Sequence, residues 1–161
     1  MINTYRNKLN NEEKGFTLIE LLLTIGILAI LLAITLLAIN PARQFAQARN
    51  TNRRDAISQI LNAVGSYFAD HAGTLPTDLS AMPVNNLIEI ASTTMPNFCS
   101  QMVTAYMPAI PQDPQLGAKN ITQADCGGFW DSGYMLMKDG SNRVTVSATN
   151  AEIGATINIV R

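Results

Sequence analysis

The sequence predicts an α+β fold in which one long N-terminal helix packs on a small C-terminal antiparallel β-sheet. A largely apolar run over residues 16–39 is followed by apolar residues at helical spacing, and the last third of the chain alternates apolar with polar residues. The chain has 161 residues, which leaves room for one ordinary domain beside the apolar run. We expect four segments, over residues 1–15, 16–41, 42–72 and 73–161.

Residues 1–15, MINTYRNKLNNEEKG, are interpreted as a leader peptide that is removed from the mature protein. They are polar, mixed in charge and without apolar periodicity. The apolar run behind them is longer than the roughly 7–15 residues of an ordinary secretory signal. The triplet Ala46-Gln47-Ala48 leaves conventional cleavage after Ala48 as an alternative.

Residues 16–41 are predicted to form a membrane-spanning helix. The 24 residues from Phe16 to Ile39 reach roughly 36 Å as a helix, enough for a hydrocarbon core of about 30 Å. Glu20 is the only ionisable side chain among them. A carboxylate inside such a span usually has a partner and a function, so Glu20 is the first candidate site residue. The alternative is a hydrated or protonated Glu20 near the membrane surface with no specific role.

Residues 42–72 are predicted to continue the same helix as an amphipathic half. Its apolar stripe recurs every three or four residues, at Ile57, Ile60, Leu61, Val64 and Phe68. The sequence Asp70-His71-Ala72-Gly73, with Pro76 beyond it, ends the helix, which would be about 55 residues long from Phe16. Gly26 and Pro41 weaken it and are the expected points of helix flexibility.

Residues 73–161 are predicted to form a globular head. Residues 73–116 hold six of the seven prolines and are expected to form loops with short helical pieces, one near Phe98 to Met107. Strand signals follow at residues 134–137, 144–146 and 156–160, with a turn at Asp139-Gly140, and predict a three-stranded antiparallel sheet. Cys99 and Cys126 are candidates for one disulfide in an exported head, or for two free buried thiols.

Charge divides the chain into a basic segment and an acidic head. Arg43, Arg49, Arg53 and Arg54 stand without an acidic residue over positions 43–54, whereas residues 70–161 hold four basic against eight acidic side chains. Few aromatic residues interleave with these arginines, so direct nucleic-acid binding is not expected. The arginines are expected to form a solvated or salt-bridged helix outside the membrane, and could pair with acidic heads of adjacent copies of the chain.

No catalytic or metal-binding constellation is evident in the sequence. His71 is the only histidine and has no nucleophile or ligand at a suitable spacing. Four acidic residues, Asp113, Asp125, Asp131 and Asp139, could hold calcium, but their spacing differs from a dense calcium loop, so solvated loop acids are the expectation. We therefore predict that the protein is not an enzyme and has no cofactor, with calcium in the 113–139 loops as the alternative.

The stretch Lys14-Gly15-Phe16-Thr17-Leu18-Ile19-Glu20 resembles the prepilin peptidase site of type IV pilins and type II secretion pseudopilins. More loosely, Ile110-Pro111-Gln112-Asp113-Pro114 looks like the connector ahead of the final sheet in many pseudopilin-like subunits. A Cys99–Cys126 loop departs from the family, because pilins with a C-terminal disulfide loop usually enclose much of the final sheet. We therefore do not infer, for the loop between Cys99 and Cys126, the adhesive properties that the C-terminal disulfide loop has in those pilins.

The resemblance implies a pilin-like fold and a structural role. It implies cleavage between Gly15 and Phe16 by a prepilin peptidase, N-methylation of Phe16, and assembly through Glu20, which in the family pairs with the terminal amine of a neighbouring subunit. The implied partners are further pilin subunits, the peptidase, the pilus assembly platform and, before assembly, the membrane.

The implied location is a single pass through the inner or cytoplasmic membrane, followed by an extracellular or periplasmic filament. The N-inside orientation follows from the resemblance alone, because basic residues flank both sides of the span. The competing hypothesis is a membrane-anchored extracellular binding domain that does not polymerise. A pilus subunit and a secretion or competence pseudopilin share these features.

Overall fold

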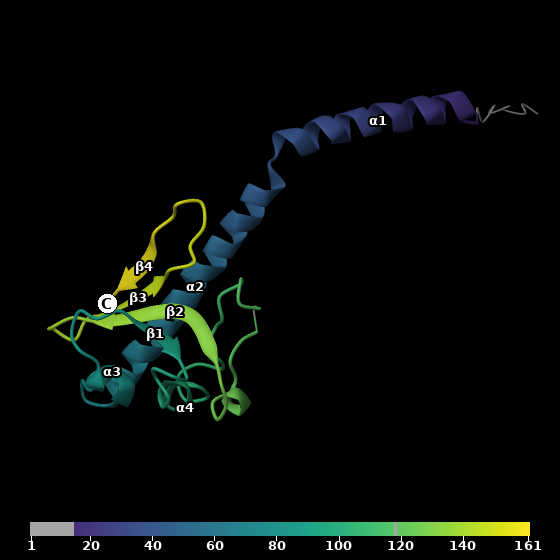
Figure 1. Cartoon of the computed structure of the whole chain (residues 1–161). Helices are drawn as coiled ribbons and strands as arrows, with labels where there is room; N and C mark the ends of the chain where they lie inside the picture. The colour runs from purple at the N-terminus through teal and green to yellow at the C-terminus, as the bar shows by residue number, and fades with distance from the viewer. Residues whose placement is uncertain (1–14, 118) are drawn as a thin grey trace, which may run out of the picture. The chain divides into compact units, whose positions relative to one another are not determined.

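The computed structural model describes residues 15–117 and 119–161 (Figure 1). It divides into two compact units, residues 1–41 and 42–161. The described part of the first unit contains helix α1 (Leu18–Ala38). We call the second unit, residues 42–161, the head; it contains α2 (Pro41–Asp70) from its second residue onward and all later elements. Residues 1–14, on which the leader prediction falls, lie outside the described residues.

Helix α1 is 21 residues long, and none of its side chains is buried. By length and composition it can cross a membrane, with a mean hydropathy of 2.9 over its most apolar window. Its threonine hydroxyls donate to carbonyl oxygens of the same helix, Thr24 to Leu21 (2.8 Å) and Thr35 to Leu32 (2.9 Å). Intrahelical bonds of this kind satisfy polar groups where no water is available.

The helix predicted from Phe16 is interrupted directly before Pro41, one of its two expected weak points: the chain leaves the helical conformation at Ile39 and Asn40. Ile39 caps α1, its N–H donating to the carbonyl of Thr35 at 3.1 Å. Pro41 then begins α2. Proline suits the first helical position, where no N–H is needed, and disfavours the helical conformation of the residue before it. Gly26, by contrast, lies inside α1 without interrupting it.

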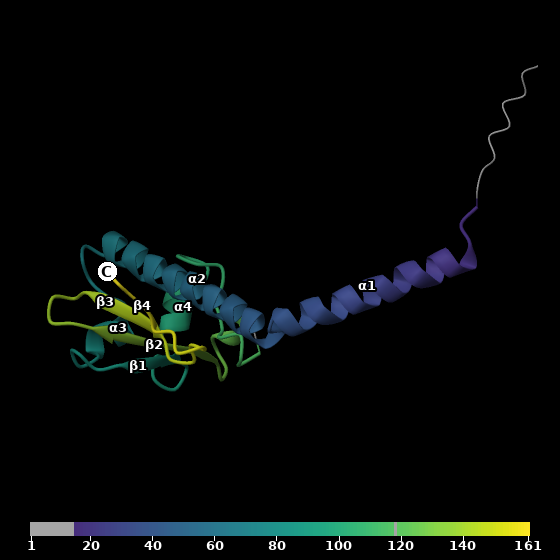
Figure 2. The ribbon, with the colours of Figure 1, turned by 90° about the horizontal axis from the view of Figure 1, so that it is seen from above.

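Helix α2 lies against the sheet (Figure 2) and packs on it through the predicted stripe. Ile57, Ile60, Leu61 and Val64 are buried in one cluster with apolar side chains of the strands, and Phe68 is half-buried against it. The helix ends at Asp70, two residues before the predicted boundary. Ala72 and Gly73 follow with positive φ, and the Gly73 N–H donates to the carbonyl of Phe68 at 2.9 Å, which closes the helix end.

The α+β prediction is confirmed, but the sheet has four antiparallel strands instead of three. They are β1 (Ile88–Ala91), β2 (Asp131–Lys138), β3 (Val144–Ala148) and β4 (Ile157–Val160), in the order β1-β2-β3-β4. The strand missed from sequence, β1, has four residues within the proline-rich region and pairs with β2. Burial alternates along β3 as the predicted period of two requires.

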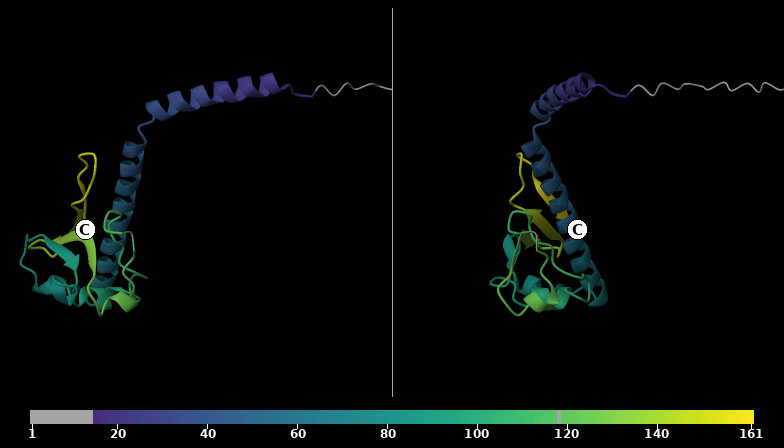
Figure 3. Two further views of the ribbon diagram at one scale, coloured as in Figure 1. Left: turned by 45° about the vertical axis from the view of Figure 1, so that its right-hand side comes forward. Right: turned by 90° about the vertical axis from the view of Figure 1, so that its right-hand side faces the viewer.

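Short helical elements precede and follow β1. Helix α3 (Thr77–Ala81) lies between α2 and β1, while α4 (Phe98–Met102) and a 3₁₀ turn, η1 (Gln123–Asp125), lie between β1 and β2. Helix α4 is shorter than predicted, because Val103 is extended and Thr104 follows with a φ of 73°. Cys99 in α4 and Cys126 after η1 are joined by a disulfide. The β3–β4 connection runs beside the N-terminal half of α2 (Figure 3).

Candidate processing and assembly site

The start of α1 is built by Thr17 and Glu20. The first four N–H groups of a helix lack partners within it, and a threonine before the first turn can accept one of them. Thr17 does so from the Glu20 N–H at 3.3 Å. In return Glu20 Oε2 accepts from the Thr17 N–H at 2.9 Å and from the Thr17 hydroxyl at 2.8 Å. This reciprocal capping box fixes the carboxylate at the first turn.

The capping box leaves one carboxylate oxygen of Glu20 outside it, because every one of these contacts uses Oε2 or the backbone N–H. Phe16, immediately before the cap, has 81% of its side chain exposed. A Cβ on Gly15 would meet no atom within 4 Å, so the fold of this chain does not itself require glycine there. A requirement for Gly15 would therefore come from a protein that binds this peptide.

Comparison with known protein families matches residues 10–36 to one family, described as the prokaryotic N-terminal methylation motif. The chain carries the prepilin-type motif of type IV pilins and pseudopilins. The match covers the helix start and most of α1, and the recognition made from residues 14–20 is confirmed. Searches of curated proteins and of solved structures give no match.

The match to the prepilin motif covers residues 10–36 and bears on the N-terminal part of the chain. It supports a type IV pilin-like or pseudopilin protein that a prepilin peptidase processes. One apolar N-terminal helix and this motif are consistent with membrane anchoring before assembly. Proteins of this type are structural and generally not enzymes.

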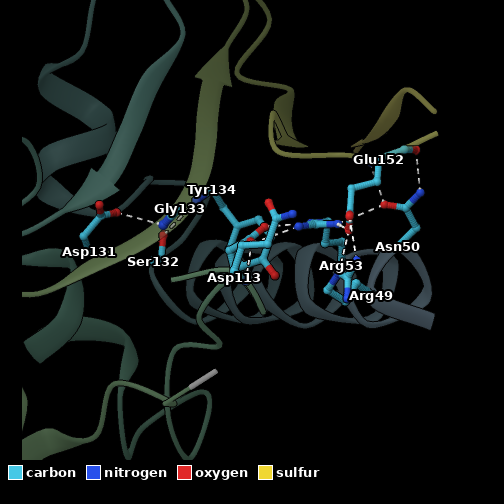
Figure 4. Close-up of polar contacts among 10 residues, drawn as sticks. Arg49, Asn50, Arg53, Asp113, Asp131, Ser132, Gly133, Tyr134 and Glu152 are labelled. Carbon is cyan, nitrogen blue, oxygen red and sulfur yellow. Dashed lines mark hydrogen bonds and ion pairs between the residues drawn. The ribbon is translucent and has the colours of Figure 1, made fainter. Parts of the chain in front are cut away.

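A second polar cluster ties α2 to the rest of the head, and we call it the arginine network (Figure 4). It consists of Arg49, Asn50, Arg53, Asp113 and Glu152. Arg53 binds Asp113 through two parallel bonds, Nε–Oδ2 at 2.7 Å and Nη2–Oδ1 at 3.0 Å, and both side chains are fully buried. Arg49 binds Glu152 in the same bidentate way, with both distances 2.7 Å.

Further hydrogen bonds join the two ion pairs of the arginine network. Arg53 Nη1 donates to Asn50 Oδ1 and to Glu152 Oε2, both at 3.0 Å. Asn50 closes the network by bonding the backbone of Glu152 through its side-chain N–H₂ (2.8 Å) and its oxygen (3.0 Å). A buried guanidinium is tolerated when its charge is paired and its nitrogens are hydrogen-bonded. Arg53 is paired with two carboxylates, and each of its three nitrogens donates at least one hydrogen bond.

The ion pairs shift the pKa values of their members. Hydrogen bonds from Arg49, then from Arg53, lower the pKa of Glu152 from 4.5 to about 2. The bond to Asp113 is the main cause that raises the pKa of Arg53. Next to this pair Tyr134 is fully buried, and burial is the main cause that raises its pKa to about 12. Glu152 and Arg53 therefore stay charged over the whole physiological range of pH.

The predicted pairing of the basic segment with adjacent subunits is wrong for Arg49 and Arg53, since both find carboxylates in their own head. Asp113 lies in the connector noted in the sequence, but nothing there indicated that it is the partner of Arg53. Asn50 and Glu152 were missed altogether, and the only available signal was the absence of acidic residues beside the arginines. The two carboxylates, Asp113 and Glu152, lie 60 to 103 residues from the arginines that they bind.

The acidic residues considered for calcium each bind a different partner in the head. Asp125 binds Lys119 at 2.8 Å and Asp139 binds Arg143 at 2.7 Å, while Asp131 accepts from the Gly133 N–H. Within residues 15–117 and 119–161, no group of three or more His, Cys, Asp and Glu side chains could hold a metal ion. His71 stacks on Tyr67 with ring centroids 3.8 Å apart.

Proposed function

We propose that this protein is a structural subunit of a type IV pilus-like filament. A prepilin peptidase cuts it between Gly15 and Phe16, the new amine of Phe16 is methylated, and the subunit polymerises through α1. Before assembly α1 anchors it in the cytoplasmic membrane, and the filament lies in the periplasm or outside the cell. Further copies, the peptidase and the assembly platform are its partners.

The observation that carries the proposal is the position of Glu20. It is the one ionisable residue of an apolar helix with no buried side chain, and the capping box holds it in the first turn. In an apolar filament core, a carboxylate and an amine are each costly alone and compatible as a pair. The carboxylate oxygen outside the capping box is available to the Phe16 amine of a neighbouring copy. Each subunit thus carries a charged group that needs a partner in the apolar core, and another subunit supplies that partner.

The helix boundary at residues 39–40 supports the same role. A subunit that leaves the membrane must present its apolar helix to other copies. The non-helical residues before Pro41 give the chain a point at which α1 and the head can change orientation. Gly26 supplies a second weak point within α1, because glycine lowers helix stability.

The first test is mass spectrometry of the N-terminal peptide from protein isolated from its native cells. A methylated Phe16 supports processing, whereas an intact Met1 or an end at Arg49 contradicts it. The second test compares Glu20→Ala with Asp55→Ala, an exposed acid in the head, for filaments sheared from cells. We expect Glu20→Ala to abolish filaments and Asp55→Ala to leave them. A methylated wild-type protein that stays in the membrane without filaments would instead indicate an anchored binding domain.

A further inference from the structure

An apolar groove of about 350 Å³ opens on the head between the C-terminal half of α2 and the β2–β3 turn. Its apolar walls come from Leu61, Val64, Phe68, Leu75 and Val144. Gly65 lies on the α2 side, and a Cβ added there would meet no atom within 4 Å. The groove is therefore open above Gly65, and a larger side chain at that position would occupy it.

Phe129 is the most exposed large hydrophobic side chain described in residues 42–161, at 82%. The chain around it is fixed on both sides. Cys126 is held by the disulfide. Trp130 is buried; its carbonyl accepts from the Ser92 N–H at 2.9 Å, and its own N–H donates to the Ser92 hydroxyl at 3.1 Å. Phe129 is thus held out from the head by an ordered loop. An exposed aromatic ring on such a loop is typical of a binding anchor.

Phe129 and the groove lie at opposite ends of strand β2. Phe129 precedes the first residue of β2, Asp131, and the groove residues 141–144 follow its last, Lys138. Eight residues at about 3.3 Å each separate the two sites by roughly 26 Å. Phe129 therefore cannot enter the groove of its own chain, whereas it can enter that of another copy.

Charges next to the two sites are complementary. At the groove, Arg143 is neutralised by Asp139, but Arg161 donates to the amide oxygen of Asn62 and forms no ion pair among the described residues. Beside Phe129, Asp125 is neutralised by Lys119. Asp131 accepts from the Gly133 N–H and forms no ion pair within the described chain. One unpaired cation thus lies at the groove, and one unpaired anion lies two residues from Phe129.

We propose that Phe129 of one copy binds in the groove of the next, with Asp131 facing Arg161. The two surfaces are different, so the contact is heterologous and leaves a free groove and a free Phe129 at the ends of any row of copies. Repeating this contact from copy to copy extends an open row. This contact deepens the proposed function and rests on it, since it adds a head-to-head interface to the polymerisation of α1.

Photocross-linking in the full chain tests the contact directly. A photoreactive benzoyl-phenylalanine is placed at position 129, and assembled filaments are irradiated and digested for mass spectrometry. We expect cross-links to residues 61–68 or 141–144 of a second copy and a ladder of covalent oligomers. Filaments that form but cross-link elsewhere, or to another protein, overturn the contact alone. Absence of filaments from the wild-type chain overturns the proposed function and the contact together.

Matched variants supply the second measurement. Gly65→Leu fills the groove, whereas Gly65→Ala leaves it open. Phe129→Ala removes the anchor, whereas Val84→Ala removes an exposed apolar side chain elsewhere on the head. We expect Gly65→Leu and Phe129→Ala each to reduce sheared filaments by about tenfold or more, as loss of a binding anchor does, with both controls near wild type. Equal yields from all four variants would overturn the contact.

Discussion

The guanidinium of Arg53 and the carboxylate of Asp113 form a bidentate ion pair, at 2.7 and 3.0 Å, with neither side chain exposed to solvent. Arg53 lies on α2, and Asp113 lies in the connector that leads toward β2. The pair therefore fixes the connector against the helix. Glu152 and Arg49 do the same for the β3–β4 connection, so one network holds both irregular segments of the head in place.

Removing Arg53 should destabilise the head strongly, because Asp113 would be left buried and unpaired. We expect Arg53→Met to lower the free energy of unfolding by about 3–5 kcal/mol. Denaturant unfolding of the full chain in detergent micelles measures it. Arg54→Met, at the exposed neighbouring position, is the control and should change stability little. Equal losses in the two variants would contradict a structural role for the pair.

Acid should weaken the head through Glu152. Its pKa is about 2 in the folded chain and 4.5 without its arginine partners, so its contribution to stability is complete above about pH 5 and is lost as the pH falls toward 2. Asp125 and Asp139 also have lowered pKa values, each through a basic partner. The test therefore compares wild type with Glu152→Gln. Between pH 5 and 2, the melting temperature should fall less steeply for Glu152→Gln than for wild type. Parallel curves would contradict it.

Loss of the disulfide should destabilise the segment between α4 and η1. Cys99 and Cys126 are 27 residues apart, and the chain-entropy model gives about 3–4 kcal/mol for a loop of this length. We expect a Cys99→Ser, Cys126→Ser double variant to melt at a lower temperature than wild type under non-reducing conditions. Adding reductant should lower the melting temperature of the wild-type chain only. A wild-type chain that is fully alkylated before reduction would refute the bond.

Substitution of Gly133 should strain the backbone at the start of β2. Its φ is 74°, and an added Cβ would lie 2.6 Å from Leu116 Cδ1 and 2.9 Å from Asp113 Cβ. We expect Gly133→Ala to cost about 1–3 kcal/mol of unfolding free energy. Gly140→Ala, where a Cβ would meet no atom within 4 Å, should remain within about 0.5 kcal/mol of wild type. A Gly133→Ala variant as stable as Gly140→Ala would show that Leu116 can move aside.

Much of the fold follows from local pattern. The apolar run, the stripe from Ile57 to Phe68 and the alternation in β3 predicted their elements because side-chain periodicity reflects which face is buried. Strand β1 was missed because four residues in a proline-rich region carry no periodic signal of their own. It forms a strand because its backbone pairs with that of β2.

The sequence by itself determined the processing motif, Glu20 and the apolar helix, since their chemistry depends on residues close together in the chain. Only the tertiary structure decided where the arginines of α2 find their carboxylates, because Asp113 and Glu152 lie 60 and 99 residues from Arg53. It also decided that Phe129 is exposed at one end of β2 and that an apolar groove opens at the other. Burial and proximity arise from packing distant segments together, and no local pattern specifies them.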